Sequence, residues 1–226
     1  MGLKEMLKRL AKVVAILIII AVFAIGCGRG QSQTGIWTKF SDMQLPPDIE
    51  LTNPWTAEGI FKKYLVYRGV LRFQTGGTST GLFIHPEERF DNEVGSTAEV
   101  RMKLLGESKT GHEINVFLLQ DGSLEGKVLF FNDRIEIYDQ NDLEATYKMD
   151  TTDRFHTYRL AIAKHSLEVY VDGGRVSSVT LNNPVSNKMV LFGDASEREG
   201  EDINAQIDYI AYSVKGAMAP WREAIK

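Results

Sequence analysis

The sequence contains very little cysteine and histidine. Cys27 is the only cysteine in 226 residues, so an intramolecular disulfide is excluded and the fold has to rely on its hydrophobic core. The chain shows no internal repeat with a period of about 20 to 50 residues, which argues against a repeat architecture. The four histidines are scattered without local metal-ligand spacing, which predicts structural or surface roles for His85, His112, His156 and His165.

A long apolar run occurs only once, near the N-terminus. Four basic residues within the first 12 positions precede the uninterrupted apolar stretch 13–25. This stretch has the length of a signal-peptide core and falls short of the roughly 20 residues that a transmembrane helix needs. We therefore predict a signal peptide at residues 1–26, followed by a Gly/Ser/Gln-rich flexible linker at 27–39.

The single cysteine stands directly after this run. Gly26 before Cys27 resembles the lipobox of bacterial lipoproteins, although Ala24 stands where Leu is usual. The resemblance implies that Cys27 carries a diacylglyceryl group and often a third acyl chain such as palmitate, which anchors the protein outside the cytoplasm. Gly28, rather than Asp, resembles lipoproteins sent to the outer membrane where the organism has one. Two alternatives stay open: an uncleaved N-terminal anchor helix, and a cleaved signal peptide with an unmodified thiol.

Removal of the residues before Cys27 makes the chain more acidic. The mature chain has 22 basic and 29 acidic residues and a net charge of −7, against −4 for the whole sequence. An acidic surface argues against nucleic acid as a partner and against electrostatic docking on anionic lipid. The lipid group alone is then expected to make the membrane contact.

From Tyr64 onward the hydrophobic pattern has a period of two, which is typical of half-buried strands. Turn signals such as Asp172-Gly173-Gly174 separate the runs. The pattern predicts an all-β antiparallel sandwich or barrel over residues 40–220, with a short tail at 221–226. The expected strands are 64–74, 97–105, 112–120, 126–132, 134–139, 145–149, 156–163, 166–172, 175–181, 188–194 and 206–214.

Three segments of the last third resemble the concanavalin A-like lectin and glucanase superfamily, near its laminin-G-like branch. They are "FHTYRLAIAKHSLEVYVDGGRVSSVTL" (155–181), "VLFGDASE" (190–197) and "IDYIAYSVKGAMAP" (207–220). The resemblance covers about residues 64–220 and implies a jelly-roll sandwich of two curved sheets with one concave face.

The catalytic pattern of this superfamily is missing. Its glucanases carry a Glu-x-Asp-x-x-Glu strand, which supplies two carboxylates about 5–5.5 Å apart. The nearest acidic run, Glu197–Asp202, reads as a loop that contains a Gly. Gly77–Gly81 has the letters of a nucleophile elbow, but a loop composition instead of the strand and helix that this motif needs. A hydrolase typical of the superfamily is therefore disfavoured.

The resemblance also implies a candidate calcium site. Several similar sandwiches bind a structural calcium through an Asp on the last strand, and Asp208 matches that position. Carboxylate and carbonyl oxygens are the ligands that this hard cation takes. The alternative is that Asp208 caps a hydrogen-bond network or is exposed. The acidic turn Asp139–Glu144 lacks the Gly and the spacing of a calcium loop.

Carbohydrate binding would depend on aromatic side chains that stack on sugar rings, with polar groups beside them. Tyr170 alternates with apolar positions on its strand and is expected to be exposed, with Arg159 on the polar side of the neighbouring strand. Tyr138 and Glu136 are expected to point outward in the same way. Tyr158 has the alternation of a core residue.

These observations leave three functional hypotheses. The favoured one is a membrane-tethered lipoprotein of the cell envelope whose non-catalytic sandwich binds carbohydrate or another envelope component. The alternatives are a glycan-active hydrolase or lyase, and a structural or adhesion lipoprotein with a protein partner. The missing paired-carboxylate pattern favours binding over catalysis.

Overall fold

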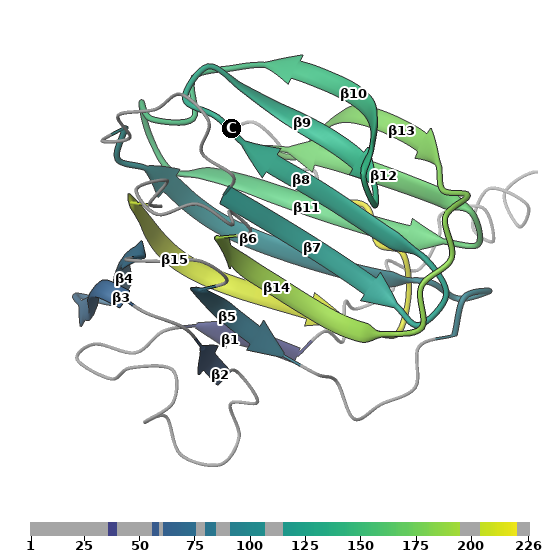
Figure 1. Cartoon of the computed structure of the whole chain (residues 1–226), viewed down its shortest axis with the longest axis horizontal. Coiled ribbons are helices and arrows are strands. Elements are labelled where there is room, and N and C mark those ends of the chain that lie inside the picture. Colours follow the sequence, from purple (N-terminus) through teal and green to yellow (C-terminus); the bar gives the residue numbers. More distant parts are fainter. Residues whose placement is uncertain are drawn as a thin grey trace, which may run out of the picture. The chain divides into compact units, whose positions relative to one another are not determined.

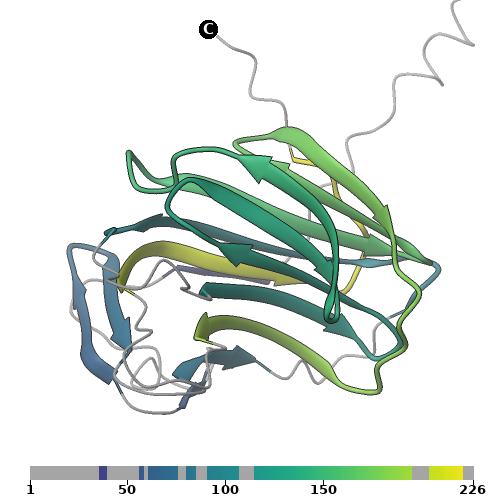
Figure 2. The ribbon, with the colours of Figure 1, turned by 45° about the horizontal axis from the view of Figure 1, so that its top comes forward.

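The chain is an all-β protein in the part that its computed structural model describes, which is residues 36–39, 56–58, 61–75, 80–84, 91–106, 115–194 and 204–220. Within these residues fifteen strands form two antiparallel sheets, and none of the described residues is helical (Figure 1). The sandwich expected from the period-two pattern is therefore confirmed. Figures 1 and 2 show the two sheets as stacked layers.

Sheet A contains eight strands in the order β13-β12-β11-β6-β15-β4-β3, and β1 also pairs with β15. On one side of β15, β4 pairs with its first half and β1 with its second half. The strands are β1 Ile36–Lys39, β3 Phe61–Tyr67, β4 Val70–Thr75, β6 Ser96–Leu104, β11 His156–Ala163, β12 Ser166–Val171, β13 Gly174–Thr180 and β15 Asn204–Ser213.

Sheet B contains seven strands in the order β10-β9-β8-β7-β14-β5-β2. Four strands that follow one another in sequence, β7 to β10, lie side by side, and β14 joins them after the chain has passed through sheet A. The strands are β2 Thr56–Glu58, β5 Thr80–Ile84, β7 Asn115–Asp121, β8 Glu125–Phe130, β9 Arg134–Asp139, β10 Asp142–Lys148 and β14 Lys188–Asp194.

The hydrophobic core lies between the two sheets and takes alternate residues from each strand. Met102 of β6 and Phe117 of β7 are both 0% exposed, as their alternation predicts. Tyr158 of β11, predicted to be a core residue, is 1% exposed. Its ring centroid lies 4.7 Å from that of Phe130 of β8 in an edge-on contact. Aromatic pairs of this kind join the two sheets and add about 0.5–1.5 kcal/mol beyond area burial.

The strand predicted over residues 64–74 is wrong in one respect, because it is a hairpin of β3 and β4. Arg68 and Gly69 form its turn with φ values of +50° and +77°. Two successive positive φ values match the twist of a tight antiparallel hairpin. Apolar residues stand directly on both sides of the turn, so the run of hydrophobic residues alone did not show the break.

The predicted boundary between linker and sandwich at residue 40 also moves. Ile36–Lys39 pairs with β15 as β1, with Ile36 opposite Tyr212 and Lys39 opposite Tyr209. Four residues of the stretch predicted as linker therefore belong to sheet A. Residues Thr34–Lys226 form one compact unit, which holds every described strand and the core. In the described ranges there is no helix long and apolar enough to cross a membrane.

Three of the strands at sheet edges carry a register irregularity. Such bulges twist an edge strand and hinder its pairing with another chain. The irregularities of β3, β10 and β13 lie between Phe61 and Lys63, between Leu143 and Ala145, and opposite Val169 and Tyr170. These edge strands are therefore poorly suited to pairing with a strand of another chain.

Candidate functional site

The outer face of sheet B gathers polar side chains from three neighbouring strands, β7, β8 and β9. Side chains alternate across a strand, so the residues between core positions point away from the core. In register, Gln120 pairs with Glu125 and Lys127 pairs with Tyr138. We call the polar set on this face the sheet B ladder; it consists of Gln120, Glu125, Lys127, Arg134, Glu136 and Tyr138.

Glu136 is held by two donors within the ladder. Arg134 Nε donates to Glu136 Oε1 at 2.8 Å, and the Tyr138 hydroxyl donates to Glu136 Oε2 at 2.8 Å. The guanidinium carbon of Arg134 lies 3.9 Å from the centroid of the Phe131 ring. The Glu136 carboxylate is therefore oriented by its two hydrogen bonds. The Arg134 guanidinium is oriented by the ion pair with Glu136 and by its contact with the Phe131 ring.

Lys127 links the two ends of the ladder. Gln120 Nε2 donates to Glu125 Oε2 at 2.6 Å, and Lys127 Nζ lies 3.6 Å from Glu125 Oε1. The same Nζ lies 5.7 Å from the centroid of the Tyr138 ring, within the range of a cation–π contact. The ladder is thus continuous across three strands.

The Tyr138 phenol is a proton donor at neutral pH. Burial raises the pKa of Tyr138 to about 12, and the hydrogen bond to Glu136 and its negative charge act in the same direction. The hydrogen bond to Glu136 likewise raises the pKa of Arg134. The centre of the ladder therefore presents a neutral aromatic ring beside a permanent cation.

An apolar cluster adjoins the ladder on the same face. Val116, Leu118 and Leu129 are buried there, with exposed fractions of 2 to 8%. The partly buried side chains packed against them are Phe131, Tyr138, Met189 and Leu191. Only these partly buried side chains can offer apolar surface beside the polar groups of the ladder, and that combination is the usual composition of a small-molecule site.

Glu125 and Glu136, the two glutamates of the ladder, lie well apart along the sheet. Glu136 is in register with Leu129, which is four residues from Glu125 on β8. At the rise of a strand, this places the two Cα atoms about 14 Å apart. Glycosidases need carboxyl groups roughly 5 to 10 Å apart. Lys127 and Tyr138 lie between the two glutamates on this face.

Tyr170 and Arg159 lie together, but on the outer face of sheet A. They are directly paired between β11 and β12, and both sheets separate them from Tyr138 and Glu136. The expected exposure of Tyr170 is wrong, because this residue is only 7% exposed. Its hydroxyl donates to Glu168, which also accepts a hydrogen bond from Arg175 Nη1 at 2.6 Å. The hydroxyl is therefore engaged by a carboxylate that is itself paired with a cation.

Arg159 is engaged in structural contacts. Its Nε donates to Glu99, and its Nη1 donates to the carbonyl oxygen of Met218 at 3.1 Å. Glu99 also accepts a hydrogen bond from the Tyr209 hydroxyl at 2.6 Å. Arg159 and Glu99 are 4% and 5% exposed. The pair is therefore buried, with the main chain of the C-terminal segment bound to it.

Asp208, the predicted calcium ligand, forms an ion pair. Arg101 Nη1 lies 2.5 Å from Asp208 Oδ2, and the two side chains are 39% and 31% exposed. Within the described part of the chain, no three His, Cys, Asp or Glu side chains are grouped so as to hold a metal ion. The contact with Arg101 agrees with the alternative given in the sequence analysis, in which Asp208 takes part in hydrogen bonds.

Other sequence-derived candidates fall elsewhere. Cys27 and Glu197–Asp202 lie outside the described residues, as does most of Gly77–Gly81. Two members of the ladder were not predicted from the sequence: Lys127, which lies opposite Tyr138, and Gln120, which binds Glu125. The signal was present in the turn at Asn132-Asp133, since a two-residue turn there sets Lys127 opposite Tyr138.

Comparison with known proteins identifies the fold. No protein-family model and no curated protein matches the sequence. Among solved structures, the botulinum neurotoxin serotype D binding domain is similar with a TM-score of 0.53 and 12% identity, over 80% of this chain and 48% of that one. This chain thus spans about half the length of that toxin domain.

Two smaller structures are similar over nearly their whole length. The Bacillus licheniformis β-glucanase has a TM-score of 0.53 and 15% identity, covering 81% of this chain and 99% of the glucanase. The metal-free carbohydrate recognition domain of Emp46p has a TM-score of 0.50 and 17% identity, covering 80% and 99%. Identities this low establish the fold alone: the chain is a concanavalin A-like jelly-roll sandwich.

Proposed function

We propose that the protein is a lipoprotein of the cell envelope, tethered outside the cytoplasm through Cys27, whose sandwich binds carbohydrate without cleaving it. The observation that carries this proposal is the sheet B ladder, in which the Tyr138 ring stands among fixed polar groups. Similar sandwiches include a carbohydrate recognition domain as well as a glucanase, so the fold is compatible with a glycan ligand.

The contacts of the ladder explain how such a ligand would be held. Aromatic faces give an apolar platform for the C–H groups of a sugar, and the ring of Tyr138 supplies one. Arg134 and Glu136 are oriented before the ligand arrives, so little side-chain entropy is lost when hydroxyl groups bind to them. Lys127 adds a cation that favours a sugar with a negatively charged substituent.

The separation of Glu125 and Glu136, the two glutamates of the ladder, supports the non-catalytic part of the proposal. Glu125 and Glu136 are about 14 Å apart at their Cα atoms by strand rise, and each is held by its own donors. Glycan turnover by this face would need a second carboxyl group near Glu136.

Glycan-array binding with residues 31–226 tests the ligand-binding proposal. Saturable binding is expected, and Tyr138→Ala should weaken it about tenfold to thirtyfold. Tyr147→Ala is the matched control, because Tyr147 is an exposed tyrosine of the same sheet that is paired with the core residue Ile135. Equal loss in both variants, or turnover of a chromogenic glycoside that Glu136→Gln abolishes, would contradict the proposal.

The mass of the mature full-length chain tests the tether. We expect a chain that begins at Cys27 and carries two or three acyl groups, and that partitions into detergent. Cys27→Ala should be recovered without acyl groups. A mature chain with a free Cys27 thiol would refute the anchor and leave the glycan-binding test unaffected.

A further inference from the structure

We infer that the β3–β4 hairpin docks on the membrane surface and contacts anionic lipid headgroups beside the tether. The inference deepens the proposed lipid anchor, which brings the membrane close to this hairpin. It also differs from the expectation drawn from the net charge, because the charge of the chain is unevenly distributed.

The hairpin is basic within an acidic protein. The whole chain has a net charge of −4, yet residues 61–75 contain four basic residues and no acidic one. A further cation, Lys103 of β6, lies on the same face of sheet A as Arg72. Both residues are in register with Gln206 of β15, one on each side of it. Asp208, the single acidic residue of β15, is paired with Arg101. The basic residues of the hairpin are Lys62, Lys63, Arg68 and Arg72.

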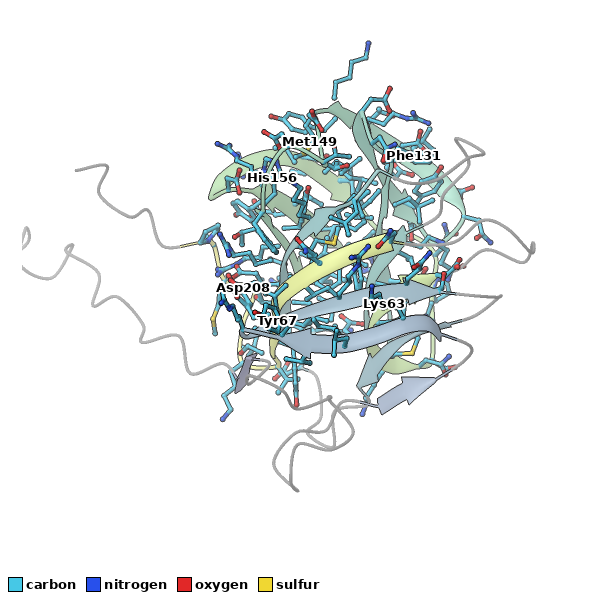
Figure 3. All side chains as sticks on the ribbon, turned by 90° about the vertical axis from the view of Figure 1, so that its left-hand side faces the viewer. Lys63, Tyr67, Phe131, Met149, His156 and Asp208 are labelled. Atoms are coloured by element: carbon cyan, nitrogen blue, oxygen red, sulfur yellow. The ribbon has the colours of Figure 1, made fainter. Side chains whose placement is uncertain are left out.

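Apolar side chains lie among these cations. Lys63, Leu65 and Tyr67 alternate along β3 on the face away from the core, and Figure 3 labels Lys63 and Tyr67 on this hairpin. Leu65 is 50% exposed and Tyr67 is 61% exposed. The guanidinium carbon of Arg68 lies 5.2 Å from the centroid of the Tyr67 ring. Tyrosine with neighbouring Arg and Lys is the composition that proteins present to the headgroup region of a bilayer.

The strand that follows the proposed tether, β1, ends next to this hairpin. Leu71 of β4 is opposite Ile207, and Lys39 of β1 is opposite Tyr209, so β4 and β1 follow one another along the same side of β15. The turn at Arg68-Gly69 therefore lies at the end of β1. Cys27 precedes Ile36 by nine residues, a reach of at most about 32 Å. The hairpin turn lies beside Lys39, three strand residues or about 10 Å beyond Ile36, so an acyl group on Cys27 would hold the hairpin within about 42 Å of the bilayer.

Because the acyl group on Cys27 would already hold the protein at the membrane, a weak affinity of the hairpin for lipid headgroups is sufficient. Each Lys or Arg near an anionic surface strengthens partition about fivefold, and a short tether supplies a high local concentration of lipid. A nucleic acid would also attract the cations, but its phosphate backbone offers no apolar partner for Leu65 and Tyr67. The two exposed apolar side chains therefore favour a membrane.

Flotation of residues 31–226 with lipid vesicles tests the inference without the tether. We expect binding to vesicles of phosphatidylcholine with about 30 mol % phosphatidylglycerol, and little binding to phosphatidylcholine alone. Lys63→Gln/Arg68→Gln should lower the partition coefficient about 30-fold. Tyr67→Ser, which removes an exposed ring, should lower it as well, and about 0.5 M salt should abolish binding.

Lys148→Gln/Lys164→Gln is the matched control, because it removes the same charge from exposed sites outside the hairpin. This control should bind within about twofold of the parent chain. Equal loss in the two double variants, equal binding to both vesicle types, or binding to duplex DNA in place of vesicles would overturn the inference. A missing acyl group on Cys27 or a failed glycan array leaves these outcomes unchanged, so the proposals fail separately.

Discussion

His156 connects two loops at one end of the sandwich through both of its ring nitrogens. Nδ1 lies 2.7 Å from Asp172 Oδ2, and Nε2 lies 2.7 Å from Asp153 Oδ1. Because carboxylates only accept, both hydrogen bonds form together when the ring carries two protons. The hydrogen bond to His156 holds the pKa of Asp153 below its ordinary value. For Asp172, burial raises the pKa, but hydrogen bonds from Thr157 N–H and His156 outweigh it and the pKa is lowered.

We predict that His156→Gln lowers the free energy of unfolding at pH 7 by about 2 kcal/mol, since it removes hydrogen bonds to charged groups. The lowered pKa values of Asp153 and Asp172 mean that their stabilisation is present above about pH 4 and is lost as the pH falls further. Urea unfolding at pH 7, 5 and 3 should therefore show a shallower loss in the variant. The control is Arg154→Gln, because Arg154 pairs with Asp172 through a side chain that is 68% exposed. Equal acid sensitivity of His156→Gln and the parent chain would disprove this account.

The buried pair of Glu99 and Arg159 explains why sequence alternation did not identify Arg159 as a structural residue. Arg159 lies on the outer face of sheet A, as predicted. The C-terminal segment packs on Arg159, whose Nη1 donates to the Met218 carbonyl oxygen. Alternation gives the side of a sheet on which a residue lies, and contacts from distant segments decide whether it is exposed. The partner of Asp208 also comes from a distant segment, since Arg101 lies 107 positions away in the sequence.

We predict that Arg159→Met lowers the free energy of unfolding by about 3–5 kcal/mol, because it leaves Glu99 buried without its cation. The double variant Glu99→Gln/Arg159→Met should recover part of this loss, since no unpaired charge remains. Urea unfolding of the two single variants and the double variant measures the coupling. Strictly additive losses would show that the pair is not coupled.

At the scale of elements, the sequence predicts the strands more reliably than the connections and pairings between them. The alternation in β11 and β12 and the turn at Asp172-Gly173 are confirmed, because local pattern and turn chemistry agree there. The break at Arg68-Gly69 was missed, since apolar residues stand directly on both sides of it. The pairing of β1 with β15 depends on residues about 170 positions apart, and no local pattern carries that information.

Gly126 of β8 marks a close approach between the two sheets. A Cβ atom there would lie 2.8 Å from Leu167 Cδ1 of β12, a residue that is 0% exposed. Gly126→Ala should therefore lower the free energy of unfolding by about 1–3 kcal/mol through overpacking. Gly174→Ala is the control, because the nearest atom to its added Cβ is the Val171 carbonyl oxygen at 3.5 Å. Thermal unfolding compares the two, and equal effects would contradict the close approach.

At the scale of the molecule, the two proposed binding surfaces belong to different sheets. The ladder lies on the outer face of sheet B, and the basic hairpin is the end of sheet A formed by β3 and β4. The core packs between these sheets, so no side chain is shared by the two surfaces. A protein docked through the hairpin would keep its ladder free for a glycan.

We therefore predict that glycan binding and membrane binding are independent. A saturating glycan should leave the vesicle partition of residues 31–226 unchanged within about twofold, since coupling requires a conformational difference that both ligands favour or disfavour. Tyr138→Ala should weaken glycan binding alone, and Lys63→Gln/Arg68→Gln should weaken vesicle binding alone. Titration of each ligand in the presence of the other measures the coupling directly. A change in either affinity larger than about fivefold would show that the two sheets move together on binding, and that the sandwich is not a rigid support for two separate surfaces.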